Sequence, residues 1–182
     1  GIVNVKAENI HKKEKQEMKH MNLLTMKPIL YALNIDEGFS GSVPRPMQEF
    51  HPILISAKIE SELTELSEDE AKMMLQELGM QESGLDRLAK EAYRLLGLIS
   101  FLTTGEKETR AWTIPLGTPA QKAAGVIHSD FEKGFIRAEV IYYKRFLEIK
   151  NWKTAKEKGM VRQEGKEYIM QDGDVVEFLV NN

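Results

Sequence analysis

The chain has 182 residues, 42% of them hydrophobic, and its 25 lysines and arginines against 28 aspartates and glutamates give a formal charge of −3. This balance suits one domain or two small ones and gives no overall basic field for nucleic acid, although a local basic patch stays open. The sequence has no cysteine, which excludes disulfides, thiolate nucleophiles and cysteine-ligated zinc. It also has neither an apolar run of membrane-spanning length nor a signal-peptide pattern at its start, so we expect a soluble, cytoplasmic protein.

The first elements predicted along the chain are a helix and two short strands. The helix is expected to end near Met26, because Pro28 cannot continue it. The apolar runs 29–33 and 52–55 are typical of short buried strands. Between them, the segment 39–50 is rich in glycine, serine and proline and is expected to be a loop.

Each predicted strand is followed by a short polar turn, Asn34–Gly38 after the first and Ser56–Lys58 after the second. Strands that lead through turns into helices are typical of the last part of a parallel α/β domain, where ligands bind at the carboxyl ends of the strands. Three helices with apolar faces are expected next, at 60–66, 67–78 and 83–97, and the second of them begins with a capping box.

From Leu98 onward the pattern changes to short strands, turns and a few helices, which predicts a small α+β domain of β-grasp type. Thr118 is expected to cap the first helix, with Pro119 at its first position, and Asp172–Asp174 to be a hairpin turn. The expected elements are strands at 99–103, 109–116, 135–142, 166–171 and 175–180, and helices at 118–125, 143–149 and 152–158.

The block His128-Ser129-Asp130 comes nearest to a catalytic group. A triad needs a positioned nucleophile and a general base needs a nearby substrate proton, and the sequence gives no sign of either. Capping or turn-fixing hydrogen bonds are therefore favoured over partner contact and over catalysis, and we predict no catalytic residue. The four histidines lack the spacing of a metal site, so we predict no metal site.

The C-terminal half is rich in lysine and arginine interleaved with aromatic residues. One interpretation is an RNA-facing surface, where cations contact phosphates and aromatic rings stack on bases. The other is a solvated face above an aromatic core, and interspersed acidic residues favour it. The candidate contacts to RNA or another partner are Lys133, Arg137, Lys144 and Arg145.

The sequence contains no G-x-x-x-x-G-K-[ST] loop. Phosphate cradling and magnesium binding in nucleotide hydrolases need the backbone of that loop, its lysine and its hydroxyl group. We therefore do not expect this chain alone to hydrolyse a nucleoside triphosphate.

Several segments together resemble the YchF/Obg-like ATPase family. They are N-L-L-T-M-K-P at 22–28, the turns Asn34–Glu37 and Ser56–Lys58, R-A-W-T-I at 110–114, the run at 123–140 and Y-I-M-Q-D-G-D-V at 168–175. The resemblance extends from about Glu14 to the last residue, and the region 110–140 carries its most specific motif.

This resemblance implies a translation-associated P-loop NTPase with a G domain, a helical coiled-coil insertion and a C-terminal TGS domain of ubiquitin-like β-grasp fold. It implies binding of ATP or GTP, with ATP favoured, together with Mg²⁺, and contact with the ribosome or RNA through the TGS domain. On this basis residues 1–27 are a helical segment, 28–97 the C-terminal part of the G domain and 98–182 the TGS domain. The fold class is then α/β followed by α+β, with the parallel-sheet G domain incomplete and its phosphate-binding loop absent.

The resemblance also assigns recognition of the nucleotide base to the two polar turns. The first turn matches the family's N-x-x-E element, in which a glutamate and an apolar residue replace the aspartate and lysine of ordinary GTPases. Both changes fit relaxed or adenine-favouring recognition, and the second turn matches the loop whose backbone amides line the base. The residues assigned to the base are Asn34, Ile35, Glu37, Ser56, Ala57 and Lys58.

We therefore expect the C-terminal part of a ribosome-binding ATPase or GTPase that carries base recognition and a partner-binding TGS domain. Hydrolysis would belong to a longer protein and not to this chain alone. The alternative is a stand-alone regulatory module that binds RNA or the ribosome and has no nucleotide site.

Overall fold

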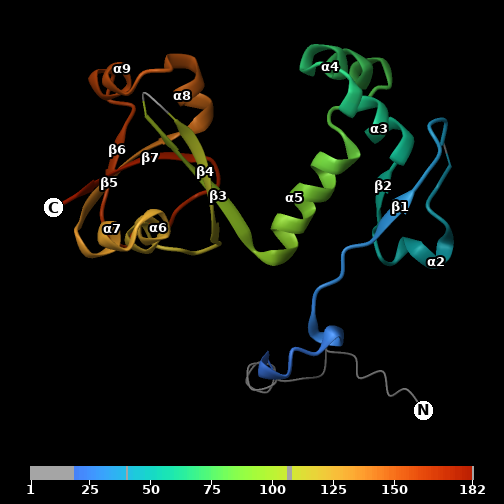
Figure 1. Cartoon of the computed structure of the whole chain (residues 1–182), viewed down its shortest axis with the longest axis horizontal. Helices are drawn as coiled ribbons and strands as arrows, with labels where there is room; N and C mark the ends of the chain where they lie inside the picture. The colour runs from blue at the N-terminus through green and yellow to red at the C-terminus, as the bar shows by residue number, and fades with distance from the viewer. Residues whose placement is uncertain (1–18, 40, 106–107, 182) are drawn as a thin grey trace. The chain divides into compact units, whose positions relative to one another are not determined.

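The computed structural model describes residues 19–39, 41–105 and 108–181 (Figure 1). The chain divides into two compact units, with the boundary between Leu96 and Gly97. Each unit has its own sheet. Within the described ranges, no helix is both long enough and apolar enough to cross a membrane.

The N-terminal unit is built on a pair of parallel strands followed by helices. Its elements are the 3₁₀ helices η2 (Lys19–Met21) and η3 (Leu24–Met26), β1 (Ala32–Asn34), α2 (Arg45–Gln48), β2 (Ile53–Ile55), α3 (Ala57–Glu65), α4 (Glu68–Glu77) and α5 (Gly84–Leu96). Ala32 pairs with Ile53 and Asn34 with Ile55, so β1 and β2 end side by side. This register fixes where the two polar turns leave the sheet.

Three predictions for this unit need correction. From Lys19 onward the expected N-terminal helix is two 3₁₀ turns, because Asn22 lies between them at φ 49°, where a right-handed helix cannot continue. The earlier part of that helix lies outside the described residues. The segment 39–50 contains the short helix α2, whose first turn includes Pro46, and β1 begins at Ala32, later than predicted.

The predicted capping box of α4 is present, and α5 has a side-chain cap as well. Ser67 Oγ accepts a hydrogen bond from Glu70 N–H at 3.5 Å, and Glu70 Oε2 accepts one from Ser67 N–H at 3.0 Å, which completes the capping box of α4. At the start of α5, Ser83 Oγ accepts a hydrogen bond from Asp86 N–H at 3.0 Å. These caps satisfy backbone N–H groups that the first turn of a helix leaves unpaired.

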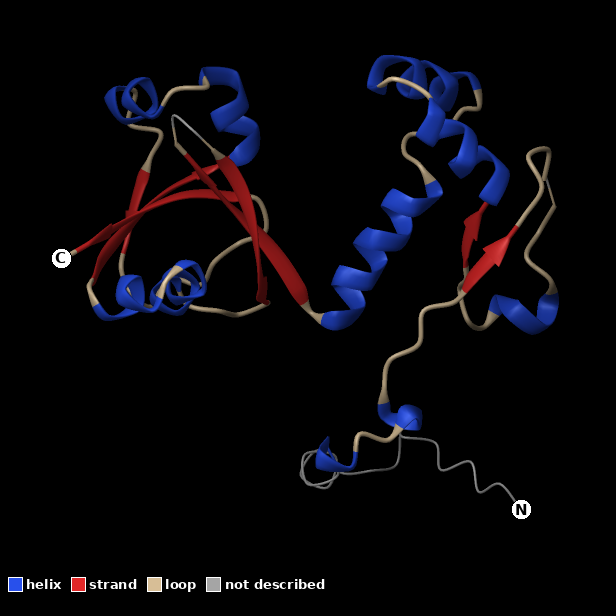
Figure 2. Ribbon diagram, in the orientation of Figure 1, coloured by secondary structure: helices blue, strands red, loops and turns tan. Residues whose placement is uncertain are grey.

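The C-terminal unit is a five-stranded mixed sheet with helices on both faces (Figures 1 and 2). Its elements are β3 (Leu98–Thr104), β4 (Thr109–Pro115), α6 (Ala120–Ile127), α7 (Ser129–Lys133), β5 (Phe135–Tyr142), α8 (Tyr143–Ile149), α9 (Trp152–Glu157), β6 (Arg162–Glu164) and β7 (Asp174–Val180). The strand order is β4-β3-β7-β5-β6, with β3 and β7 parallel and the other neighbours antiparallel. This order, with α6 packed across one face, is a β-grasp arrangement.

Alternation along the strands produces two hydrophobic clusters, one on each face of this sheet. Val140 and Val176 face the first cluster with Phe101, while the adjacent Ile141 and Val175 face the second. Helices α6 and α7 cover the first face, and α8 and α9 cover part of the second (Figure 2). Strands β5 and β7 therefore have apolar partners on both sides.

The predicted hairpin of 166–171 with 175–180 is wrong. The first of these segments is not a strand and makes one isolated bridge, from Ile169 to Pro119, while β7 pairs with β5 and β3. The turn between them docks on β3 instead. Ser100 N–H donates to Asp172 Oδ1, and Gly173 N–H donates to Ser100 O, each at 2.8 Å.

The predicted start of the first helix in this unit is also wrong. Helix α6 begins at Ala120, with Pro119 as its N-cap residue, because the Thr118 hydroxyl donates back to Pro115 O at 2.6 Å. The Ala120 N–H, which has no partner inside the helix, donates to Tyr168 O at 2.8 Å. The segment misread as a strand therefore supplies the acceptor that the helix end needs.

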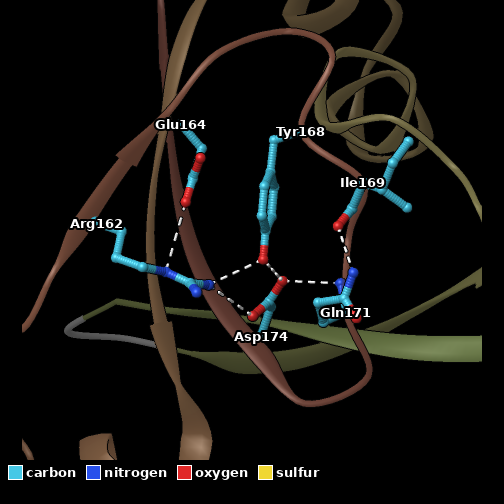
Figure 3. A network of polar contacts seen from close by, with 6 residues as sticks. All are labelled: Arg162, Glu164, Tyr168, Ile169, Gln171 and Asp174. Carbon is cyan, nitrogen blue, oxygen red and sulfur yellow. Dashed lines mark hydrogen bonds and ion pairs between the residues drawn. The ribbon is translucent and has the colours of Figure 1, made fainter.

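A buried carboxylate holds this same segment against β6 and β7 (Figure 3). Asp174 is 1% exposed, and its Oδ2 accepts hydrogen bonds from Tyr168 Oη and from Gln171 N–H, both at 2.9 Å. Arg162 donates to Tyr168 Oη at 2.9 Å and lies 3.7 Å from Asp174 Oδ1. The loop 165–173 is thus fixed by a satisfied polar network rather than by strand pairing.

The network predicts an unusually late ionisation of one tyrosine. Burial and the hydrogen bond to Asp174 raise the pKa of Tyr168 from 10.0 to about 12. Because the folded state favours the neutral phenol, its stabilising effect is complete below about pH 10 and is lost as the pH rises towards 12. In a phenolate absorbance titration, the difference between the wild-type chain and Tyr168→Phe should have its midpoint near 12. Circular dichroism at each pH controls for unfolding, and a difference midpoint near 10 would contradict the prediction.

Candidate functional site

The candidate site of the N-terminal unit is a pocket of about 320 Å³ between the turns that follow β1 and β2. Because the two strands are parallel and in register, both turns leave the sheet at the same edge. The pocket is lined by Asn34, Ile35, Asp36, Glu37, Gly38, Ser56 and Lys58. Of the residues assigned to the base from the sequence, all line the pocket except Ala57.

Ala57 contributes through its backbone, which joins the two turns. Its N–H donates to Asn34 Oδ1 at 3.0 Å, and Ile35 N–H donates to Ile55 O at 2.8 Å. The buried Ser56 begins α3 as its N-cap residue. Asn34 and Ser56 are therefore held in position by the protein itself, before any ligand is bound.

An ion pair connects the first turn to the start of α3. The Lys58 ammonium contacts the Glu37 carboxylate and lies 3.9 Å from Glu62. The hydrogen bond to Glu37 raises the pKa of Lys58. Both side chains are well exposed, so solvent screens the pair and it contributes little stability. The ion pair affects ligand recognition, because a ligand that binds the Glu37 carboxylate must compete with Lys58 for it.

A buried glutamate that the sequence analysis missed fixes α3 next to this pocket. Glu60 is 7% exposed, and its carboxylate accepts a hydrogen bond from Gly84 N–H, at the start of α5, at 2.6 Å. Arg87 of α5 donates to Leu54 O of β2 at 2.7 Å. Nothing in the sequence separates Glu60 from an exposed neighbour such as Glu62, because its partner lies in another helix.

The block His128-Ser129-Asp130 makes one of the predicted capping hydrogen bonds. His128 is the N-cap residue of α7, and its Nδ1 accepts a hydrogen bond from Asp130 N–H at 3.2 Å. A cavity of about 470 Å³ beside it is lined by His128, Asp130, Phe131, Val180 and Asn181. In the part of the chain that the structure describes, no group of three or more histidines and carboxylates could hold a metal ion.

The four candidate cations for RNA contact lie on three elements. Lys133 is on α7, on the side of the first cluster, and lies 3.8 Å from Asp130. Arg137 is on β5 and lies 3.7 Å from Glu139. Lys144 and Arg145 are adjacent and exposed on α8, on the side of the second cluster. The structure therefore does not gather the four into one surface.

Known proteins are similar in sequence to this chain over nearly its whole length, which includes both units. Residues 98–181 match the family model YchF-GTPase_C, described as a protein of unknown function (DUF933). The chain is 47% identical to the "Ribosome-binding ATPase YchF" of Bacillus subtilis over 96% of the chain and 51% of the relative. It is 41% identical to the protein of that name from Escherichia coli O157:H7, over 97% of the chain and 51% of the relative.

A solved structure extends these similarities to the fold. The Schizosaccharomyces pombe YchF GTPase aligns with a TM-score of 0.79 and 30% identity, over 96% of this chain and 49% of that one. The alignment therefore includes most of both units. The chain spans about half the length of the relatives it matches.

Proposed function

Because this chain belongs to the YchF family, we propose that it is the C-terminal part of a ribosome-associated ATPase or GTPase. In this proposal the N-terminal unit is the end of a parallel-sheet G domain that recognises the nucleotide base, and the C-terminal unit is a partner-binding TGS domain. A ribosome-associated role places the protein in the cytoplasm.

One observation carries the nucleotide part of the proposal. The Asn34–Ala57 hydrogen bond joins two strand-end turns into a pocket of about 320 Å³, at the edge of the sheet where parallel α/β domains bind ligands. The pocket offers amide, carboxylate and ammonium groups within a small volume, a combination that suits the polar edge of a purine. The residues proposed to contact the base are Asn34, Ile35, Glu37, Ser56, Ala57 and Lys58.

The size of the sheet supports an incomplete domain. Among the described residues of this unit, β1 and β2 form a two-stranded parallel sheet of three residue pairs. Parallel sheets are otherwise buried on both faces and need more strands to be stable. A groove of about 660 Å³ lies beside β2 and α5, lined by residues such as Ile53, Leu54 and Leu95. We propose that the rest of the sheet, the phosphate-binding loop and the Mg²⁺ site belong to a longer protein that contains this chain.

The base pocket predicts weak but selective nucleoside binding by the chain itself. Saturation-transfer NMR with millimolar adenosine or guanosine should give stronger signals from adenosine, and Asn34→Ala should weaken adenosine binding about 5- to 10-fold. That loss corresponds to about 1 kcal/mol for one hydrogen bond that organises the site. The matched control is Asn151→Ala, which removes a cap in the other unit. Equal adenosine binding by Asn34→Ala and the control would sink the base assignment.

The assignment of base recognition to the first turn can also be tested with nucleoside triphosphates in the longer protein. Glu37→Asp restores the shorter acid of ordinary GTPases and should shift the affinity ratio from ATP towards GTP. An unchanged ratio in both Glu37→Asp and Asn34→Ala would remove the assignment of base choice to this turn.

The second candidate function is an RNA- or ribosome-binding module without a nucleotide site. It is favoured by the C-terminal unit, which has two hydrophobic clusters of its own and exposed cations on α8. Ribosome co-sedimentation of residues 98–182 separates the two functions. Pelleting of this piece, with no nucleoside binding by the whole chain, would favour the second candidate.

A further inference from the structure

The helical pair α8–α9 concentrates positive charge, most of it without an acidic partner among the residues that the structure describes. Lys144, Arg145, Lys150, Lys153 and Lys158 are all exposed, and in the described part of the chain none of them is within ion-pair distance of a carboxylate. The segment 143–158 has six cations against two glutamates. Its sixth cation, Lys156, contacts Glu139 at 2.6 Å and Glu177 at 2.9 Å.

Elsewhere in the C-terminal unit, most of the cations that the structure describes are neutralised locally. Lys122 contacts Glu132, Lys133 lies 3.8 Å from Asp130, and Arg162 lies 3.5 Å from Glu164. The unit thus has nearly balanced charge, but its unpaired cations gather on one pair of helices. Since charges normally gain a little from local pairing, this segregation indicates an external anionic partner.

The fold holds these cations outward on a rigid base. Phe146 and Ile149 of α8, with Trp152 and Ala155 of α9, pack into the second cluster on the sheet. Asn151 caps α9 by accepting a hydrogen bond from Thr154 N–H at 3.0 Å. The apolar faces of both helices are therefore occupied, and their charged faces are left to solvent.

The chemistry of the outward face distinguishes between classes of partner. Protein interfaces need a core of apolar and aromatic anchors and are depleted of charge at that core. The exposed residues on this face are mostly charged. Among the described residues of α8 and α9, Leu147 is the one large apolar side chain that is exposed, at 58%. Phosphate groups of RNA, in contrast, are bound by separate cations without an apolar core.

We propose that α8–α9 binds the phosphate backbone of RNA, through Lys144, Arg145, Lys150, Lys153 and Lys158. The inference builds on the proposed association with the ribosome and names the chemistry of that contact. The RNA contact is thereby assigned to the face of the sheet that α8 and α9 cover, where Lys144 and Arg145 lie. Lys133 lies on the opposite face.

The test uses the whole chain and a fluorescein-labelled RNA hairpin of about 16 base pairs, the length that other small RNA-binding domains cover. Anisotropy is measured over a range of KCl concentrations. The variant Lys144→Gln/Arg145→Gln/Lys153→Gln removes three unpaired cations, and Lys122→Gln/Lys133→Gln/Lys166→Gln removes the same charge elsewhere. A second variant, Lys150→Gln/Lys153→Gln/Lys158→Gln, serves if the first does not fold.

We expect the α8–α9 variant to lose at least tenfold in affinity, while the charge-matched control stays within about twofold of wild type. Each lost phosphate contact lowers the slope of log affinity against log salt by about 0.7 to 0.9, so three contacts lower it by about 2 to 3. Equal losses in the two variants, or no hairpin binding by the wild-type chain at low salt, would overturn the inference.

Two further measurements keep this result separate from the proposed function. If the α8–α9 variant pellets with ribosomes as well as wild type does, the inference fails while ribosome association stands. Pelleting through a surface of the chain other than α8–α9 would give that outcome. Adenosine binding by the same variant should be unchanged, because the pocket lies in the other unit.

Discussion

Replacement of Asp174 with alanine is expected to lower the free energy of unfolding of the C-terminal unit by about 3 kcal/mol. Asp174 is almost completely buried and accepts hydrogen bonds from Tyr168 Oη and Gln171 N–H. Alanine leaves both donors without their charged acceptor and leaves Arg162 without its buried carboxylate. The loop 165–173, which carries an acceptor for the first turn of α6, then loses its side-chain attachment to β7, while the backbone bond from Asp174 N–H to Gln171 O at 3.2 Å remains.

The two tryptophans of the chain make this change easy to measure. Trp112 and Trp152 both lie in the C-terminal unit, so urea unfolding followed by tryptophan fluorescence reports on that unit. Glu167→Ala, an exposed carboxylate in the same loop, is the control and should change stability by less than about 0.5 kcal/mol. An Asp174→Ala midpoint equal to that of the control would mean that the network does not hold the loop.

A double-mutant cycle isolates one bond of the network. Tyr168→Phe alone should cost about 1 kcal/mol, since Asp174 keeps its bond from Gln171 N–H. In the Asp174→Ala background the same change should cost much less, because the phenol has already lost its acceptor. Additive losses would show that Tyr168 and Asp174 act independently.

The sequence predicts those parts of the C-terminal unit whose signals are local. Strand β5 and helix α8 have the predicted bounds, because apolar alternation gives way to helical spacing at Tyr142. The segment 166–171 was misassigned because its short alternating pattern resembles a strand. Its backbone partners are distant residues such as Thr118 and Ala120, and only the folded chain brings them near.

The position of the candidate pocket could also be predicted from the sequence. Parallel strands in register place their following turns at one edge, so Asn34 and Ser56 could be grouped from sequence. Their attachment to the rest of the unit depends on Glu60 and Arg87, whose partners lie in other elements. The lysine-rich pattern likewise did not reveal which cations have acidic partners, since a pair such as Lys156 of α9 with Glu139 of β5 joins separate elements.

Replacement of Glu60 with alanine is expected to destabilise the N-terminal unit by about 2 kcal/mol and to weaken its base pocket. The change removes the acceptor for Gly84 N–H, a charge-assisted bond of 2.6 Å, and leaves that donor buried. Since Ser56 is the N-cap residue of α3, loosening the contact of α3 with α5 also loosens the turn that lines the pocket.

Amide hydrogen exchange by NMR measures this effect where it arises. The Gly84 amide should exchange faster in Glu60→Ala by a factor that reflects the lost bond, about 30-fold for 2 kcal/mol. Glu62→Ala, two residues along α3 and exposed, should leave the Gly84 amide unchanged. The tryptophan-monitored transition should also be unchanged, since both tryptophans report on the other unit. Slow exchange at Gly84 in Glu60→Ala would show that the carboxylate does not fasten α3 to α5, and the organisation of the pocket would then need another explanation.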